Sequence, residues 1–374
     1  MDFIYLDNVA TTNIDKRIIG GLMELLSNSF YNVDALYPPS LELKKLMEQS
    51  RSKVANLLNV KNQEIIFTSG ATEANNIIIR GIVEANKNKK HLITSVVEHS
   101  SVSSIFDYYE SIGYRVDRIK VDTQGNFDLA QLKKCLNADT LLVSIMSVNN
   151  ELGTILPIKE ISEIIRTNSN AYFHSDTTQA LAKIDIDLSL LDAASFSAHK
   201  INGLKGSGFA YIKKHTKMLA IISGGQQEFS LRGGTSNAPY NIMLAKTLRI
   251  ALENKEKYQQ DIQKLSAYLK EELLKIHNVS LNSANSVDHI INIDLQDLTS
   301  QVALNALFKK RILLSGHSTC SSKKISYSYI LRNMGFSLAK AQSSVRISLS
   351  HLTTKSEIDY FLVALKQIKE QYVI

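Results

Sequence analysis

Cysteine is scarce in this chain, which has only Cys135 and Cys320 among its 374 residues. Two cysteines so far apart argue against the disulfide framework that holds many small secreted proteins together. The first residues, MDFIYLDNVATT, include two acidic residues and lack the basic and then apolar pattern of a secretory signal. No apolar run is long enough to cross a bilayer. These absences predict a cytoplasmic protein without a membrane anchor.

Two nucleotide-binding motifs are also missing. The sequence contains neither G-x-x-x-x-G-K-[ST] nor G-x-G-x-x-G, which weighs against ATP and NAD as ligands. The formal charge is +7, but no basic stripe with interleaved aromatic residues accompanies it, so we expect no direct binding of nucleic acid. We predict no metal site.

Short β-branched runs alternate with helical patterns from residue 64 onward. Strands are predicted at 64–67, 91–97, 140–148, 171–176, 193–198 and 208–214, with a helix over 71–86. Such alternation predicts an α/β fold with a largely parallel sheet, in which ligands bind beyond the carboxyl ends of the strands. Polar clusters such as SGATE, EHSS, VNNE, SDTTQ and SAHK lie at those ends.

The pattern changes after about residue 241. One long helix is predicted over 245–276, followed by a strand (289–295), a helix (300–310), a strand (345–350) and a final helix that begins with a Thr354–Glu357 capping box. We therefore predict a large domain over 15–250, and a smaller α/β domain formed by 1–14 and 251–374.

Lys200 and Asp176 each follow a predicted strand. A lysine at a strand end can be partly desolvated, which makes its amine nucleophilic and suited to a Schiff base with an aldehyde cofactor. Asp176 could keep a pyridine nitrogen protonated, as pyridoxal 5′-phosphate (PLP) requires, and Gln179 could donate to the phenolic oxygen of that ring. The alternatives are a structural lysine and an aspartate that caps a helix.

The segment TSGATEANN joins a strand to a helix, where free N–H groups attract phosphate. Ala71 and Thr72 would supply donors there, and Ser197 and His199 could complete the phosphate site. His99 could stack on the ring face, although taken alone it suits a capping or core histidine equally well.

Cys320 lies in SGHSTCSSKK, a polar stretch without periodicity, with lysines nearby. It is therefore a candidate reactive thiol. Cys135 lies in a helical segment and is predicted to pack against the core. Arg346 could bind a substrate carboxylate with both nitrogens of its fork, or form a salt bridge at a strand end.

Together and in this order, these motifs resemble the cysteine desulfurases, which belong to the class V aminotransferase group of PLP enzymes. The resemblance covers nearly the whole chain, and its most specific part is SFSAHKINGLKGSG with SDTTQ upstream. Other matching stretches are YLDNVATT, FTSGATEANN, VEHSSV, VSIMSVNNELGTILPI, LRGGTSN, SGHSTCSS and VRISLSHLTTKSEID. It implies PLP fold type I, with a mostly parallel seven-stranded sheet in the large domain.

The resemblance also implies roles for single residues. Lys200 would hold PLP and move the Cα proton, while Cys320 would take sulfur from L-cysteine as a persulfide and leave alanine. The other implied roles are ring contacts for His99, Asp176 and Gln179, phosphate contacts for Ala71, Thr72, Ser197 and His199, and substrate carboxylate contacts for Asn150 and Arg346. Thr235 would reach the phosphate of a partner subunit, which implies a homodimer. A sulfur-acceptor protein would follow, in iron–sulfur cluster assembly or in the thiolation of tRNA or a cofactor.

Some stretches depart from the family pattern. Pro38, in NVDALYP, stands where the family has a histidine, and one extra residue precedes Cys320 after Gly316. The family's Arg-Ser-Gly-Thr reads Arg-Gly-Gly-Thr at 232–235, and the chain ends soon after its final predicted helix. Turnover and the sulfur acceptor therefore stay open. The alternatives are a selenocysteine lyase, another class V C–S lyase or aminotransferase, and a diverged homologue that binds a partner but turns over little.

Overall fold

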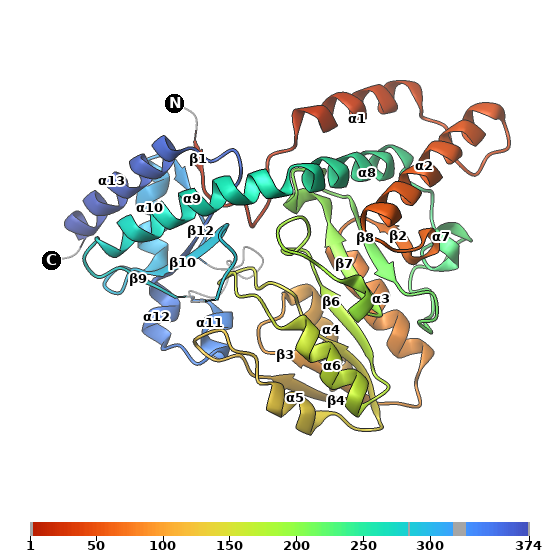
Figure 1. Ribbon diagram of the computed structural model, residues 1–374, viewed down its shortest axis with the longest axis horizontal. Helices are drawn as coiled ribbons and strands as arrows, with labels where there is room; N and C mark the ends of the chain where they lie inside the picture. Colours follow the sequence, from red (N-terminus) through yellow and green to blue (C-terminus); the bar gives the residue numbers. More distant parts are fainter. Residues whose placement is uncertain (1–2, 283–284, 317–326, 373–374) are drawn as a thin grey trace.

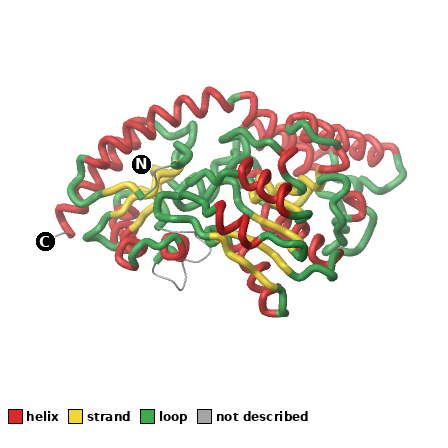
Figure 2. Tube along the Cα trace, turned by 60° about the horizontal axis from the view of Figure 1, so that its bottom comes forward, coloured by secondary structure: helices red, strands yellow, loops and turns green. Residues whose placement is uncertain are grey.

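The computed structural model describes residues 3–282, 285–316 and 327–372. Within these residues, no helix is long and apolar enough to cross a membrane. The strands form two main groups that lie apart from each other, each flanked by helices (Figure 2).

The larger group is a seven-stranded sheet in the order β2-β8-β7-β6-β5-β3-β4. Its strands are β2 (Ile65–Thr68), β3 (His91–Ser95), β4 (Arg115–Ile119), β5 (Thr140–Ser144), β6 (Tyr172–Asp176), β7 (Ala193–Ser197) and β8 (Gly208–Ile212). Only β8 runs antiparallel to its neighbours, so the prediction of a mostly parallel sheet is confirmed. Six of the seven strands are buried along their whole length or nearly so, which explains their continuous apolar runs.

Helices cover both faces of this sheet because successive side chains of a strand point to opposite sides. Ile66 packs with α3 (Ala71–Ala85) and α4 (Ser100–Ser111) on one face. Ile65 and Phe67 belong to the core on the other face. Helices on that side are α2 (Pro38–Leu57), α6 (Ile158–Asn168) and α8 (Ala238–Glu253), with α5 (Leu129–Cys135) beside α6.

The smaller group is a three-stranded antiparallel sheet in the order β12-β10-β9. Its strands are β9 (Ser280–Leu281), β10 (Ile290–Asp294) and β12 (Ser344–Ser348). A separate core lies between this sheet and the helices α9 (Lys255–Leu274), α10 (Ser300–Lys309) and α13 (Lys355–Tyr372). Two short helices, α11 (Tyr329–Asn333) and α12 (Leu338–Ser343), precede β12.

The N-terminal segment packs with this smaller group, as Figure 1 shows. β1 (Ile4–Tyr5) pairs in parallel with β11 (Ile312–Leu313), and Leu6 is buried in the second core. The chain then crosses to the large sheet and continues into α1 (Lys16–Asn28). The division into domains at 15–250 and at 1–14 with 251–374 stays a prediction.

The prediction of a single helix over 245–276 is wrong. Asn254 separates α8 from α9, and its side-chain amide donates to Ile250 O at 2.8 Å. This bond satisfies a carbonyl at the end of α8, so the first helix ends and a second begins almost end to end with it (Figure 1). The strand predicted over 140–148 is also shorter and ends at Ser144.

The other predictions of elements agree with the structure. The Thr354–Glu357 capping box is present, since the Thr354 N–H donates to Glu357 Oε2 at 2.7 Å and the Glu357 N–H donates to Thr354 Oγ1 at 3.3 Å. Pro38, which departs from the family pattern, is the first residue of α2, a position where its missing N–H costs nothing. Cys135 packs against the first core as predicted.

Candidate active site

A cavity of about 400 Å³ lies at the carboxyl ends of the parallel strands. Because these strands run in one direction, the loops that follow them meet at one edge of the sheet. The cavity brings together ten of the predicted site residues, namely Ala71, Thr72, His99, Asn150, Asp176, Gln179, Ser197, His199, Lys200 and Arg346. Thr235 is exposed and does not line it. Cys320 lies outside the described residues.

One end of the cavity suits an anion. Gly70 is the N-cap of α3 and supplies no capping side chain, so N–H groups of the first turn stay available. Its φ of +148° favours glycine, and Gly208 packs so closely that a β-carbon there would lie 2.6 Å from Gly70 Cα. Ser197 and Thr72 add hydroxyls to this end of the cavity.

His199 lines the same cavity. Burial, followed by the nearby charge of Lys200, lowers the pKa of His199 to about 4. The ring is therefore neutral at pH 7, and it would contribute a hydrogen bond, not a charge, to an anion. Its Nδ1 lies 3.2 Å from Thr11 Oγ1, which holds the ring in place.

Asp176 ends β6 and is 5% exposed. Its Oδ1 accepts from the Thr178 N–H at 3.0 Å within a turn, and no helix begins there for Asp176 to cap. Its Oδ2 accepts from the Asn75 side chain at 2.9 Å, and the same amide donates to Ser101 Oγ at 2.9 Å. Asn75 lies within the stretch TSGATEANN, and its contact with Asp176 was not predicted from the sequence. The helical spacing of Thr72 and Asn75, three residues apart, could have indicated it.

His99 is the N-cap of α4. Its Nδ1 accepts from the Ser101 N–H at 3.1 Å, so the neutral ring carries its proton on Nε2. Burial lowers the pKa of His99, which keeps the imidazole neutral near pH 7. The capping role is therefore present, and because His99 also lines the cavity, its stacking on a ring stays a prediction.

Lys200 is the last residue of a short 3-10 helix (Ala198–Lys200) that directly follows β7. Its amine donates to Val9 O at 2.7 Å and to Ala10 O at 2.9 Å. The N-terminal segment is fixed here because the Thr12 N–H and hydroxyl both donate to His199 O, at 3.0 and 2.9 Å. Val9 and Ala10 belong to the stretch YLDNVATT, and their contact with Lys200 was not predicted from the sequence.

Gln179 shares an acceptor with Lys200. Its Nε2 donates to Val9 O at 3.3 Å, and its Oε1 accepts from Lys183 Nζ at 3.1 Å. Both polar atoms of the Gln179 side-chain amide are therefore held, one by the N-terminal segment and the other by Lys183 in the same turn. The contact with a phenolic oxygen stays a prediction.

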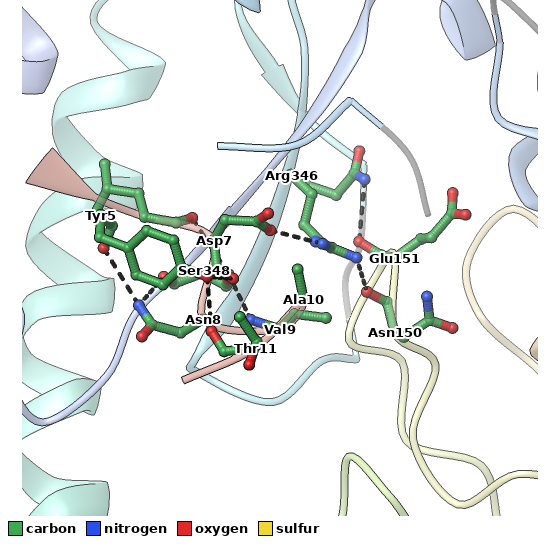
Figure 3. A network of polar contacts seen from close by, with 12 residues as sticks. Tyr5, Asp7, Asn8, Val9, Ala10, Thr11, Asn150, Glu151, Arg346 and Ser348 are labelled. Carbon is green, nitrogen blue, oxygen red and sulfur yellow. Dashed lines mark hydrogen bonds and ion pairs between the residues drawn. The ribbon is translucent and has the colours of Figure 1, made fainter. Parts of the chain in front are cut away.

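Arg346 lies in the middle of β12 and is 1% exposed. Its guanidinium donates to Asp7 Oδ1 and to the Asn150 carbonyl, both at 2.8 Å (Figure 3). The salt bridge that the sequence left open is therefore present. Its Nε has no hydrogen-bond partner within the described part of the chain, and the residue also lines the cavity. Its binding of a substrate carboxylate stays a prediction.

The donor set of the cavity fits PLP. A phosphate would meet the N-terminus of α3 with the hydroxyls of Thr72 and Ser197, and a pyridine nitrogen would meet the carboxylate of Asp176. The amine of Lys200 and the ring of His99 line the space between these two ends.

Comparison with known proteins agrees with this geometry. The family model "Aminotransferase class-V" matches residues 4–361. The chain is 38% identical to "NifS/IcsS protein homolog" of Lactobacillus delbrueckii subsp. bulgaricus, over 99% of this chain and 98% of that protein. It is 36% identical to "Cysteine desulfurase IscS" of Dictyoglomus turgidum, over 98% and 95%.

Solved structures give the same result. A structure titled "NIFS-LIKE PROTEIN" superposes with a TM-score of 0.93 at 33% identity, over 99% of this chain and 100% of that one. A second, "SspA in complex with cysteine", has a TM-score of 0.83 at 30% identity, over 94% and 100%. The fold is therefore that of NifS-like proteins along nearly the whole chain.

Proposed function

Because the chain belongs to the aminotransferase class-V family, as one of its PLP-dependent cysteine desulfurases, we propose that it passes the sulfur of L-cysteine through a persulfide on Cys320 to an acceptor protein. The observation that carries the assignment of roles is the single cavity that contains Lys200, Asp176 and His99 at the carboxyl edge of the sheet. These residues come from three different strand ends, and only the fold brings them together.

Bound PLP supplies an aldehyde for the substrate amine and a ring that withdraws electrons from Cα. Asp176 would keep a proton on the pyridine nitrogen, and its own position is fixed by Asn75 and Thr178. Lys200, at the end of β7, would move the Cα proton. His99, neutral and protonated on Nε2, would lie against the ring.

Arg346 and Asn150 would orient the substrate carboxylate. The guanidinium already has fixed hydrogen bonds to Asp7 and to the Asn150 backbone, so its plane cannot rotate freely when substrate enters. A substrate carboxylate would then bind to a prepared group at little entropic cost.

The sulfur step would use the thiolate of Cys320, which the resemblance to the family assigns. It attacks the γ-sulfur of cysteine, an S–S bond forms and the Cβ–S bond breaks. The Cys320 thiol and L-cysteine thereby become a persulfide and alanine. The proton that the Cys320 thiol loses accounts for the additional hydrogen of alanine, and the proton taken from Cα is returned to alanine. No outside oxidant is needed, because the substrate carbon takes the electron pair of the broken bond.

Three finer points belong to the same proposal. Thr235 is exposed outside the cavity of its own chain, which suits a contact with a second copy and hence a homodimer. The acceptor would serve iron–sulfur cluster assembly or the thiolation of tRNA or a cofactor. We also propose a cytoplasmic location.

The test is to incubate the PLP-loaded protein with L-cysteine and to measure alanine, sulfide and the persulfide by mass spectrometry of Cys320. We expect Cys320→Ser to keep the yellow colour of bound PLP and to lose the persulfide and nearly all alanine formation, by about 100-fold or more. Cys135→Ser is the matched control and keeps normal turnover. Normal sulfur transfer by Cys320→Ser would show that another group accepts the sulfur, and pyruvate with ammonia as main products would indicate a lyase.

A further inference from the structure

A second cavity, of about 460 Å³, also reaches Lys200 but extends away from the cofactor site toward α9. Its walls come from segments distant in sequence, with Ile250 on α8, Ile262 on α9 and Leu349 directly after β12. These side chains give the cavity apolar walls between α8, α9 and the end of β12.

Two of the basic side chains that line this cavity are Lys183 and His289, and the others are Lys200, Lys255 and His351. Lys183 as a whole is half-buried, and its side chain lines the cavity. Its amine is surrounded by protein. Burial, followed by the charge of Lys200, lowers the pKa of this amine to about 7. His289 is 7% exposed, and burial followed by the charge of Lys183 holds its pKa well below the ordinary value. His289 Nε2 has no hydrogen-bond partner among the described residues.

The remaining charged groups around the cavity do not neutralise this pair. Asp15 pairs with Arg17 at 2.6 Å, Asp288 lies 3.9 Å from Lys270, and Glu256 is exposed. Lys255 pairs with Asp185, and the ring of His351 stacks on Tyr258. In the part of the chain that the structure describes, no carboxylate lies within 4.0 Å of Lys183 Nζ or of the His289 ring nitrogens.

We propose that this cavity binds a small organic carboxylate, with its charged end against Lys183 and His289 and its apolar body against Ile250 and Leu349. The charge of Lys200 disfavours the proton of Lys183, and the charge of Lys183 disfavours a proton on His289. A carboxylate would supply the missing charge, would satisfy His289 Nε2 once that nitrogen carries a proton, and would let the amine of Lys183 stay protonated. The apolar walls favour a ligand with a compact hydrocarbon body over an inorganic anion.

The same lysine connects the cavity to the candidate active site. Lys183 Nζ donates to Gln179 Oε1, and Gln179 Nε2 donates to Val9 O, which also accepts from Lys200. A bound carboxylate would compete with Gln179 for the lysine amine and so change the position of Gln179. This consequence for catalysis rests on the proposed function, whereas binding of the carboxylate does not.

The test is calorimetric titration of the full-length, PLP-loaded protein with benzoate, and with benzamide as its neutral isostere. Saturating L-alanine is present throughout, because the carboxylate of this product would take the substrate position near Arg346. We expect benzoate to bind at least about tenfold more tightly than benzamide. At pH 8 we expect uptake of about one proton per benzoate, since the free amine of Lys183 is mostly neutral there and becomes protonated on binding. Buffers of different ionisation enthalpy measure this uptake.

Lys183→Met should remove the proton uptake and lower benzoate affinity to that of benzamide. Lys246→Met is the control, because Lys246 is also half-buried and donates to a backbone carbonyl, Arg17 O, but does not line the cavity. Equal binding of benzoate and benzamide, absence of proton uptake by the unmodified protein, or absence of benzoate binding while L-alanine is present would each overturn the proposal. The first two measurements need no variant, so they decide the matter even if Lys183→Met does not fold. Benzoate binding by a protein that makes no alanine from cysteine would reject the proposed function alone.

Discussion

The cavity at the sheet edge and the cavity beside α9 both include Lys200, yet they treat buried polar groups differently. In the first, Asp176 accepts two hydrogen bonds and His99 accepts one on Nδ1, so each group is held in a single orientation. In the second, His289 Nε2 has no hydrogen-bond partner among the residues that the structure describes, and burial lowers the pKa of Lys183 to about 7. The polar groups of the first cavity are therefore held in position before a reaction begins, whereas those of the second can still form hydrogen bonds or an ion pair with a ligand.

The largest expected effect concerns Lys200, which lines both cavities but is proposed to act only in the first. Lys200→Ala should reduce alanine formation from L-cysteine by about 1,000-fold or more, because the amine is needed both to hold PLP and to move a proton. Borohydride reduction followed by peptide mapping should find no PLP on residue 200. Benzoate binding should change little, since its proposed contacts are Lys183 and His289. An active Lys200→Ala protein would break the comparison on the side of the first cavity.

A smaller effect on activity is expected from Asn75, whose side chain donates a hydrogen bond to Asp176. Asn75→Leu removes the donor to Asp176 Oδ2 and leaves that buried oxygen without its partner, which should lower kcat about tenfold. It should also shift the pH at which the absorbance of bound PLP changes, because Asp176 is then held less firmly.

Asn76→Leu is the control for this variant. Asn76 is the next residue of the same helix, but its side chain contacts Thr72 O and Arg80 and does not reach Asp176. If both variants shift the absorbance titration equally, the effect belongs to the helix in general, and Asn75 is not a positioning residue for Asp176.

How much of this could be predicted from sequence depends on how far apart the contributing residues lie. Asp176, His99 and Lys200 were predictable because Asp176 ends an apolar strand and the other two lie shortly after one, and strand ends of a parallel sheet meet at one edge. β4 was not predicted, because this edge strand reads RVDRI and is mostly half-buried, so it lacks the apolar run of a buried strand.

The remaining omissions depend on tertiary contacts. The carbonyls of Val9 and Ala10 carry no side-chain signal, and their bonds to Lys200 join segments about 190 residues apart in sequence. Lys183 and His289 each look like an ordinary polar residue beside a strand or turn. Only the packing of α8 and α9 shows that they share one cavity.

The smallest effect concerns stability. Burial lowers the pKa of Lys183 to about 7 from an ordinary value of 10.5, so between these values the unfolded chain binds the proton more tightly than the folded chain. This penalty on folding is complete below pH 7 and disappears as the pH rises above 10.5. Lys183→Met should therefore be more stable than the unmodified protein at pH 7, on the order of 1 kcal/mol after screening by solvent in the half-buried site.

Urea unfolding at pH 7, 8 and 9 measures this difference, which should shrink as the pH rises. Lys246→Met should show no such trend. A constant difference between Lys183→Met and the unmodified protein across this range would mean that Lys183 keeps its proton in the folded state, and the contrast between the two cavities would weaken.

The N-terminal segment has a consequence for how the protein is made. Residues 9 and 10 hold the amine of Lys200, but the same segment is anchored by Asn8 Nδ2 to Ser348 O, 340 residues away, and by Leu6 to Leu313. These anchors leave the ribosome long after the N-terminal segment that they hold. The nascent protein therefore has the lysine, the aspartate and the anion-binding turn long before it has the strand pairing that closes them in. Stable retention of the cofactor should consequently begin only after synthesis has passed β12.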